Sequence, residues 1–354
     1  MQFPQMELQR QQIRAISTSD IAALAQFQPN KNRYYTQLQS GVLAASYQEV
    51  NLGQVQIFRE SLTTGARIQA APARVWLPFA AILPHSGEYR FCGREGQAGT
   101  LIQASGGEWD ICFKERLDYV STALDRQAFS TSLQRLTGEE LPQDWCLSLQ
   151  RRTDATALSR YTDGIASLLH RIHSQPQLLS QPQAQKLLGA NVLELVLAVM
   201  MPAMPLTPPN CSKPRRRLGV KRVIDYLQAH AARLPTIPEL CQVAELSERS
   251  LEYGFRDELG MTPVRYLRMV RLNGARCDLL RRRGQPTSVA EVALTWGFME
   301  FGRFAGEYRK LFHELPSQTL KQDKPSINHT PLSPPPADGD DTRVSGSASA
   351  VFAG

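Results

Sequence analysis

The side chains with the clearest chemical meaning lie on two short stretches that share one pattern of apolar and polar positions. In residues 248–258, Leu251 and Phe255 have helical spacing and are expected to face a core, which turns Arg249 outward. In residues 300–312, Phe304 and Tyr308 take the same inward positions. An arginine near the start of an exposed helix can bond guanine O6 and N7 together. These stretches therefore predict helices that read base pairs in double-stranded DNA.

The outward positions of both stretches supply the predicted DNA contacts. Base contacts are expected from Arg249, Glu252, Tyr253, Gly302, Arg303 and Gly306. Phosphate contacts, which position a protein without reading sequence, are expected from Ser247, Arg256, Arg309, Lys310 and Lys221. The two glycines would let the backbone approach the duplex closely, or they would serve close helix packing instead. For Glu252 the alternative is a carboxylate that simply faces solvent.

The two stretches belong to a repeat. Residues 236–267 and 288–320 each begin with a capping-box pattern, Thr236 with Glu239 and Ser288 with Glu291. In each, a short apolar helix, a tight turn and a second helix follow, which is the helix-turn-helix arrangement. The packing positions match at a constant offset: Leu251 with Phe304, Phe255 with Tyr308, and Leu259 with Phe312. An amphipathic helix over 265–283 joins the units, so both second helices can enter successive major grooves, roughly 34 Å apart.

The charge of the chain points to the same segment. Of 354 residues, 40 are Lys or Arg and 33 are Asp or Glu, which gives a net charge of +7. Residues 213–324 hold 21 of the basic residues and 13 of the acidic ones, so the excess lies there. A localised basic surface favours a polyanionic partner.

Residues 220–321 resemble the DNA-binding domain of AraC/XylS-type transcriptional regulators. The positions that carry the resemblance include Ala244, Ser247, Arg249, Leu251, Phe255, Gly260, Pro263, Trp296, Gly297, Phe298, Arg303, Phe304, Tyr308, Phe312 and Pro316. The form GRFAGEYR at 302–309 is similar to that of ethanolamine-operon and benzoate-type regulators. The resemblance implies an activator that binds double-stranded DNA and contacts RNA polymerase.

The first half of the chain predicts a different architecture. Short alternating stretches separated by glycine-containing turns predict strands from about 47 to 123, in a sandwich or small barrel, and helical periodicity follows over 126–200. We therefore expect an α+β multidomain chain. Its parts are a sensing or dimerisation domain (1–200), a Pro-rich basic linker (201–218), the double helix-turn-helix domain (219–321) and a disordered tail (322–354). The resemblance implies a cupin-like β fold for the first domain.

In the first half, residues 34–60, 105–113 and 185–200 are similar to stretches of ethanolamine-operon regulators. This resemblance implies a small-molecule effector, which could be an amine such as ethanolamine. An amine would need carboxylates and an aromatic face. The candidates are Glu60, Trp76, Glu88, Glu108, Trp109 and Asp110, each of which could equally be an exposed charge or a core aromatic. The nearly apolar stretch 185–200 is either a core helix or a homodimer contact.

Other classes of protein are not favoured. The predicted β region holds a single histidine, His85, and six scattered cysteines give no zinc-site spacing, so neither a metal site nor a cofactor is expected. No nucleophile elbow or phosphate loop stands in the sequence, so we expect no enzyme, although a cupin-type enzyme is a remote alternative. A nonspecific or architectural nucleic-acid binder would share the basic charge. No membrane span or signal peptide is predicted, which indicates a cytoplasmic protein.

Overall fold

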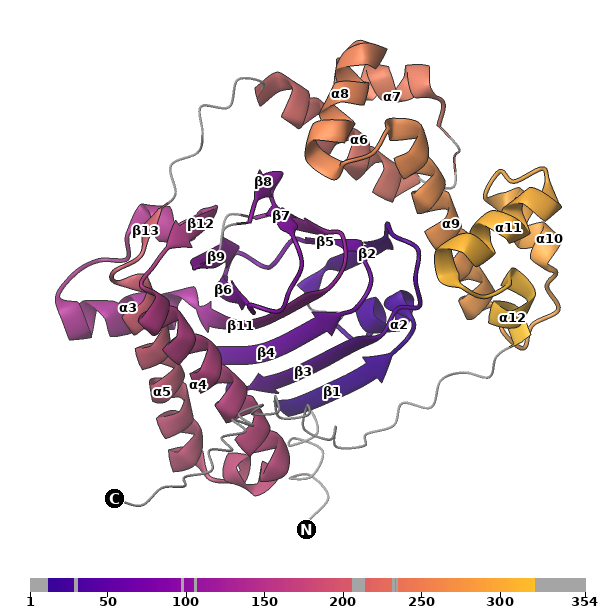
Figure 1. The fold of residues 1–354 in the computed structure, drawn as a ribbon. Coiled ribbons are helices and arrows are strands. Elements are labelled where there is room, and N and C mark those ends of the chain that lie inside the picture. Colours follow the sequence, from indigo (N-terminus) through magenta and orange to yellow (C-terminus); the bar gives the residue numbers. More distant parts are fainter. Residues whose placement is uncertain are drawn as a thin grey trace, which may run out of the picture.

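The structure is a computed structural model, and it describes residues 12–28, 31–96, 99–104, 107–205, 214–230, 233 and 235–321. The tail expected over 322–354 and the centre of the expected linker lie outside these residues. A β-rich domain with its own helices comes first, and an all-helical domain follows (Figure 1). The predicted α+β architecture is confirmed.

Two antiparallel sheets build the β domain. The larger has the strand order β1-β3-β4-β11-β6-β9-β12-β13, and the smaller has the order β2-β5-β10-β7-β8. The strands of the larger sheet are β1 (Ile13–Thr18), β3 (Ala45–Asn51), β4 (Val55–Leu62), β6 (Trp76–Ile82), β9 (Thr100–Ala104), β11 (Leu117–Asp125), β12 (Ser148–Arg152) and β13 (Met204–Pro205). Those of the smaller sheet are β2 (Arg33–Gln37), β5 (Ala66–Ala70), β7 (Tyr89–Phe91), β8 (Arg94–Glu95) and β10 (Trp109–Phe113).

The larger sheet is buried on both faces. On β4, Ile57 joins a core under the helices, while its neighbour Phe58 joins a second core that includes residues of the smaller sheet. Helices α3 (Arg126–Thr137), α4 (Ala155–Ser174) and α5 (Pro182–Met200) contribute to the first core and lie beside the larger sheet (Figure 1). On β11 every residue from Leu117 to Leu124 is buried, as expected for a strand that is covered on both faces. A short helix, α2 (Ile21–Gln26), packs near β1 and β2.

Strands extend beyond the range of 47–123 that the sequence predicted. Strands β1 and β2 precede it, and β12 and β13 follow it. β1 and β2 escaped the prediction because Arg14 and Arg33 interrupt their apolar pattern, and both arginines turn toward the interior of the domain. Helix α6 (Pro214–His230) likewise begins inside the linker expected at 201–218, because proline is accommodated in the first turn of a helix.

The C-terminal domain is the predicted repeat. Its helices are α7 (Ile237–Ala244), α8 (Glu248–Leu259), α9 (Pro263–Arg281), α10 (Val289–Thr295), α11 (Phe301–Phe312) and α12 (Pro316–Lys321). Both capping boxes form, at Thr236 and at Ser288, and Ser247 caps α8. The matched apolar pairs of α8 and α11 are all buried. Helix α9 runs from the first unit to the second (Figure 1).

The two domains touch directly. The backbone N–H of Gln37, at the end of β2, donates to Asn273 Oδ1 on α9 at 3.0 Å, and Asn273 Nδ2 donates back to the Gln37 carbonyl at 3.0 Å. Farther along this junction, Arg67 Nη1 donates to the Tyr266 hydroxyl at 3.2 Å. The β domain therefore packs against the helix that joins the two helix-turn-helix units.

Candidate nucleic-acid interface and effector cavity

Helix α8 presents an exposed polar face beyond its buried apolar one. Arg249 is exposed and its guanidinium carbon lies 5.7 Å from the centre of the Tyr253 ring. Tyr253 is 44% exposed, which is high for a large aromatic residue. Glu252 and Arg256 form an ion pair at 3.0 Å, so part of the charge on this face is neutralised before any partner binds. The N-terminal half of α8 thus offers one unpaired guanidinium beside an exposed ring.

Helix α11 presents the second face. Cβ atoms built on Gly302 and Gly306 would meet nothing within 4 Å, so neither glycine serves close packing. This settles the alternative in favour of an open backbone surface. Arg303 is exposed and its Nε donates to Glu307 at 3.2 Å, while Arg268 of α9 also binds Glu307 with its Nη2 at 2.7 Å. Glu307 is therefore shared between two arginines, and its contact with Arg303 is the longer of the two.

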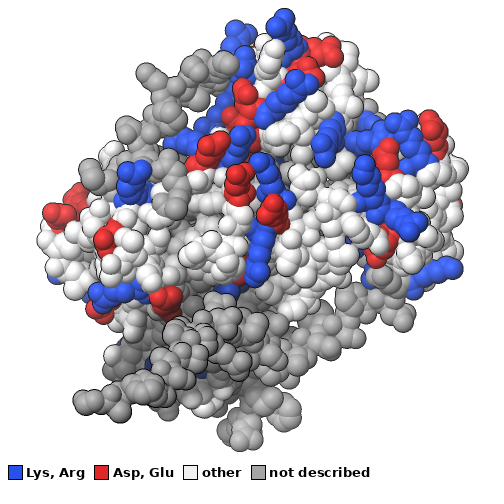
Figure 2. Space-filling model, in the orientation of Figure 1, with Lys and Arg blue, Asp and Glu red and all other residues white. Residues whose placement is uncertain are grey.

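The predicted phosphate contacts fall into two groups. Ser247, Arg256, Arg309 and Lys310 are exposed on or beside α8 and α11. Lys221 instead lies at the domain junction, where it pairs with Glu108 of the β domain at 2.6 Å and with Asp225 at 3.4 Å. In this arrangement Lys221 is bound to carboxylates rather than free for a phosphate. Figure 2 shows basic side chains concentrated over the C-terminal helices, with acidic ones among them.

The six effector candidates do not form one site. Glu88 pairs with Lys114 at the surface and Glu108 pairs with Lys221 at the junction. Asp110 is held by Arg67 at 2.9 Å. Trp76 and Trp109, by contrast, line one cavity.

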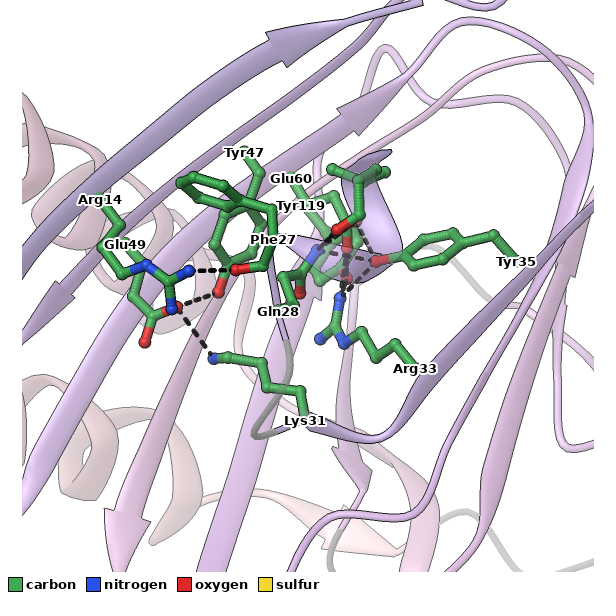
Figure 3. Close-up of polar contacts among 11 residues, drawn as sticks. Arg14, Phe27, Gln28, Lys31, Arg33, Tyr35, Tyr47, Glu49, Glu60 and Tyr119 are labelled. Carbon is green, nitrogen blue, oxygen red and sulfur yellow. Dashed lines mark hydrogen bonds and ion pairs between the residues drawn. The ribbon is translucent and has the colours of Figure 1, made fainter. Parts of the chain in front are cut away.

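Glu60 is fully buried and already saturated with donors. Arg33 and Tyr119 donate short hydrogen bonds to its carboxylate, and the Tyr35 hydroxyl donates at 2.5 Å (Figure 3). Burial raises the pKa values of Tyr35 and Tyr119, so both phenols stay protonated and serve as donors. Glu60 is therefore a structural counter-ion for Arg33, and it has no capacity left for an amine.

The cavity lies between the two sheets and has a volume of about 160 Å³. Its walls are mostly apolar and include Phe58, Trp76, Phe91, Ile102 and Trp109. The charged residues of its lining are Arg14, Lys31, Arg33 and Glu49, so positive charge is in excess. A small cationic amine would meet like charges here, and the expectation of an amine effector is not supported by this geometry.

Sequence reasoning missed the basic residues of the cavity. Arg14 lies on β1, while Lys31 and Arg33 lie two residues apart, just before and at the start of β2, and all three precede the predicted β region of 47–123. One signal was available in the sequence. In Arg33-Tyr34-Tyr35, the alternation of a strand puts the charged Arg33 on the same inward face as Tyr35. The sequence could not show which cavity these side chains line, because the other walls come from strands far along the chain.

Among the described residues, no helix has the length and apolar character needed to cross a membrane. Within the same ranges, no cluster of three or more His, Cys, Asp or Glu side chains has the geometry of a metal site.

Comparison with known proteins agrees with the geometry. A family model described as a helix-turn-helix domain matches residues 240–322. The probable thc operon regulatory protein of Rhodococcus erythropolis is 32% identical over 204 residues, which are 56% of this chain and 59% of that protein. The XylDLEGF operon transcriptional activator 2 of Pseudomonas putida is 38% identical over 104 residues, 29% of this chain and 66% of that protein.

A solved structure of a probable AraC family transcriptional regulator from Rhodopseudomonas palustris is 35% identical. The match covers 29% of this chain and 94% of that one, with a TM-score of 0.28. The chain spans about three fifths of the thc regulator and two thirds or less of the XylDLEGF activators. The family match and the structure agree on the coarser statement that the C-terminal part of the chain, over residues 240–322, is a helix-turn-helix domain.

Proposed function

We propose that the chain is a ligand-responsive, sequence-specific transcriptional activator of an operon, with α8 and α11 as its reading helices. The observation that carries this proposal is the pair of second helices on one joining helix, each with a buried apolar face and an exposed arginine. Such a pair fits two successive major grooves. The names of the relatives, an operon regulatory protein and operon activators, support activation.

We assign the cavity of the β domain to the effector. It lies between the two sheets, is mostly apolar, and is lined by a few polar groups, as small-molecule sites are. Activation would proceed by contact with RNA polymerase, as the resemblance of the C-terminal domain implies. The protein would act in the cytoplasm, where its DNA lies.

A homodimer is also part of the proposal. Helix α5 contributes Val192, Val196 and Val199 to the core, so its apolar character is largely explained by packing within the chain. Leu187 on the same helix remains 63% exposed, and it is the position where a second copy could add burial.

The test is an in-vitro selection of duplexes by the full-length protein at physiological salt. We expect a motif of two short half-sites whose centres lie about one helical turn apart. Enrichment of duplexes without a common motif would replace the proposal with a nonspecific or architectural binder, because such a protein depends on phosphate charge alone.

A further inference from the structure

Three buried polar atoms of the cavity lining have no hydrogen-bond partner. They are Arg33 Nε, Trp109 Nε1 and Gln28 Oε1. Buried polar groups in folded proteins are nearly always satisfied, and an unmade hydrogen bond is costly. Among the described residues only three other buried side-chain atoms share this condition, on Arg126, His173 and Arg271. Half of these unpaired atoms therefore gather on one cavity, two of them as N–H donors.

Arg33 and the largely buried Lys31 share an aromatic neighbour in the cavity lining. The Arg33 guanidinium carbon lies 5.6 Å from the centre of the Trp109 ring and 5.1 Å from that of Phe58. Lys31 Nζ lies 3.9 Å from the centre of the same Phe58 ring. Figure 3 shows Lys31 and Arg33 extending into the same region of the domain. Two cationic groups thus lie over the Phe58 ring, and one of them, Arg33, also lies over the Trp109 ring.

The carboxylates of the region do not cancel this charge. Glu60 is engaged by Arg33 and by the hydroxyls of Tyr35 and Tyr119. Glu49 accepts from the Tyr47 hydroxyl and lies 3.6 Å from Lys31 Nζ, which is an ion pair without close hydrogen-bond geometry. Burial lowers the pKa of Lys31 to about 8, because its positive charge is poorly compensated where it stands. An anion would relieve that cost.

The rest of the cavity limits the size and polarity of the occupant. A volume of about 160 Å³ is similar to that of an engineered cavity of about 150 Å³ that takes up benzene. The other walls come from aromatic and aliphatic side chains and small residues, among them Phe91, Ile102 and Ile111. A polar body would leave its own hydrogen bonds unmade against such walls.

We propose that the cavity binds a small organic carboxylate with a compact apolar body about the size of one six-membered ring. Its carboxylate would accept hydrogen bonds from Arg33 Nε and Trp109 Nε1 and lie beside the Lys31 ammonium group. This proposal rests on the assignment of the cavity as the effector site, and it reverses the charge expected from the sequence.

Three ligands of one shape and different charge test the proposal with the full-length protein at pH 7. They are cyclohexanecarboxylate, cyclohexanecarboxamide and cyclohexylmethylamine, and each is titrated by isothermal calorimetry. We expect saturable binding of the carboxylate, at least about tenfold weaker binding of the amide, and no binding of the amine, since one charged hydrogen bond is worth a tenfold change or more. Equal binding of amide and carboxylate, preference for the amine, or no carboxylate binding at millimolar concentration would overturn the proposal.

Two variants locate the site. Trp109→Phe keeps an aromatic ring but removes the N–H donor, and Lys31→Met keeps the chain length but removes the charge. Each is expected to weaken carboxylate binding about tenfold or more while leaving the amide nearly unchanged. Lys114→Met is the matched control, because Lys114 is an exposed lysine that pairs with Glu88 outside the cavity. Carboxylate affinity that is unchanged in both cavity variants would place the anion elsewhere.

The outcome is separable from that of the proposed function. Carboxylate binding needs no DNA, and the selection of duplexes needs no carboxylate. A preferred DNA site together with failed carboxylate binding would overturn only the ligand class. Carboxylate binding together with no preferred DNA site would overturn the regulator and leave the cavity as an anion site.

Discussion

At the scale of single residues, the exposed arginines of α8 and α11 differ in the groups that they contact. Arg249 lies beside the Tyr253 ring, and Arg303 donates to Glu307, which Arg268 also binds. Arg249→Ala and Arg303→Ala should each cost about 1–3 kcal/mol at one base pair of the selected site and relax the preference there. Fluorescence anisotropy against single-base-pair variants of that site, at fixed salt, measures the effect.

The control for these two variants is Arg160→Ala, which removes an exposed arginine from α4 of the β domain. It should leave base preference unchanged. Arg249 and Arg303 variants that bind every duplex with the parental order of preference would show that neither side chain reads a base.

Lys31 gives the protein a pH-dependent response to an anion. The titratable and charged groups that face it are Glu49 and Tyr47 of β3, Arg33 of β2 and Glu60 of β4, and Arg14 of β1 lines the same cavity. Its pKa of about 8 in the free protein means that it is mostly charged at pH 7 and neutral well above pH 8. A bound carboxylate favours the charged form, so its binding raises the pKa of Lys31 and takes up a proton above pH 8.

Carboxylate affinity should therefore hold steady below about pH 7 and fall above pH 8, by up to about tenfold per pH unit. Titrations between pH 6 and 9.5 check the slope, in roughly half-unit steps. Burial raises the pKa of Tyr47 well above its ordinary value, so this phenol does not contribute to the slope. Lys31→Met should give a flat profile, and an equally steep profile in that variant would assign the titration to another group.

At the scale of elements, α8 and α11 use the same inward positions and different outward ones. On α8, a Cβ added at Gly254 would meet Val220 at 2.6 Å, so this glycine permits close packing against α6. On α11, a Cβ added at Gly306 would meet nothing within 4 Å. Glycine in the middle of a helix is less favourable than alanine by roughly 0.5–1 kcal/mol. Gly306 therefore weakens α11 without any packing inside the protein to explain it.

Gly306→Ala should raise the free energy of unfolding by about 0.5–1 kcal/mol and weaken DNA binding, because the methyl group would stand where the duplex approaches. Urea denaturation and anisotropy with the selected duplex measure the two effects. Gly254→Ala is the contrasting variant and should lower stability, since its methyl group has no room. Unchanged DNA affinity in a stabilised Gly306→Ala protein would contradict close approach of this backbone to DNA.

At the scale of the whole molecule, the β domain forms hydrogen bonds with both α8 and α11 near their C-terminal ends. The Leu311 carbonyl, at the end of α11, accepts from Gln37 Nε2 at 3.0 Å and from the Gly41 N–H at 3.1 Å. Near the end of α8, the Asp257 carbonyl accepts a short hydrogen bond from Arg90. Arg249 and Arg303, which point outward from the N-terminal halves of the two helices, remain exposed. The docked β domain thus contacts both helices near their C-terminal ends and leaves the outward side chains near their N-terminal ends exposed.

Asn273 connects this junction to the cavity domain. Its amide pairs with both backbone groups of Gln37, and Gln37 stands on the same strand as the cavity residue Arg33. Asn273→Ala should leave two buried backbone groups unpaired and weaken docking by about 1–3 kcal/mol. Hydrogen exchange should accelerate over residues 37–41 while β4 and β11 stay protected. Gln242→Ala, on the exposed side of α7, serves as the control, and unchanged exchange at 37–41 would show that Asn273 does not hold the domains together.

The same variant is expected to affect DNA binding. Because both reading helices are held by one domain, release should weaken binding to a duplex with two half-sites more than to a duplex with one. Anisotropy with the two duplexes measures the difference. Tighter binding of the two-site duplex by Asn273→Ala would show instead that docking holds the units in an unfavourable arrangement.

The sequence by itself determined the C-terminal domain. Capping boxes, turn residues and matched apolar pairs act within a few residues or one helical turn, so Thr236, Ser288 and the Leu251–Phe304 match already carried the repeat. The exposure of Arg249 and Arg303 follows from the same periodicity.

Only the tertiary structure decided which partners the charged side chains of the β domain bind and which of them line the cavity. Glu60 looked like a ligand group and is bound to Arg33, Tyr35 and Tyr119, which come from two other strands. Lys221 looked like a phosphate contact and is bound to Glu108, more than a hundred residues away. The excess of positive charge in the cavity follows from Arg14 on β1 and from Lys31 and Arg33 around the start of β2, two segments that the fold brings to one space. Local periodicity cannot encode such encounters, because they depend on which distant strands pair and on which face each side chain points.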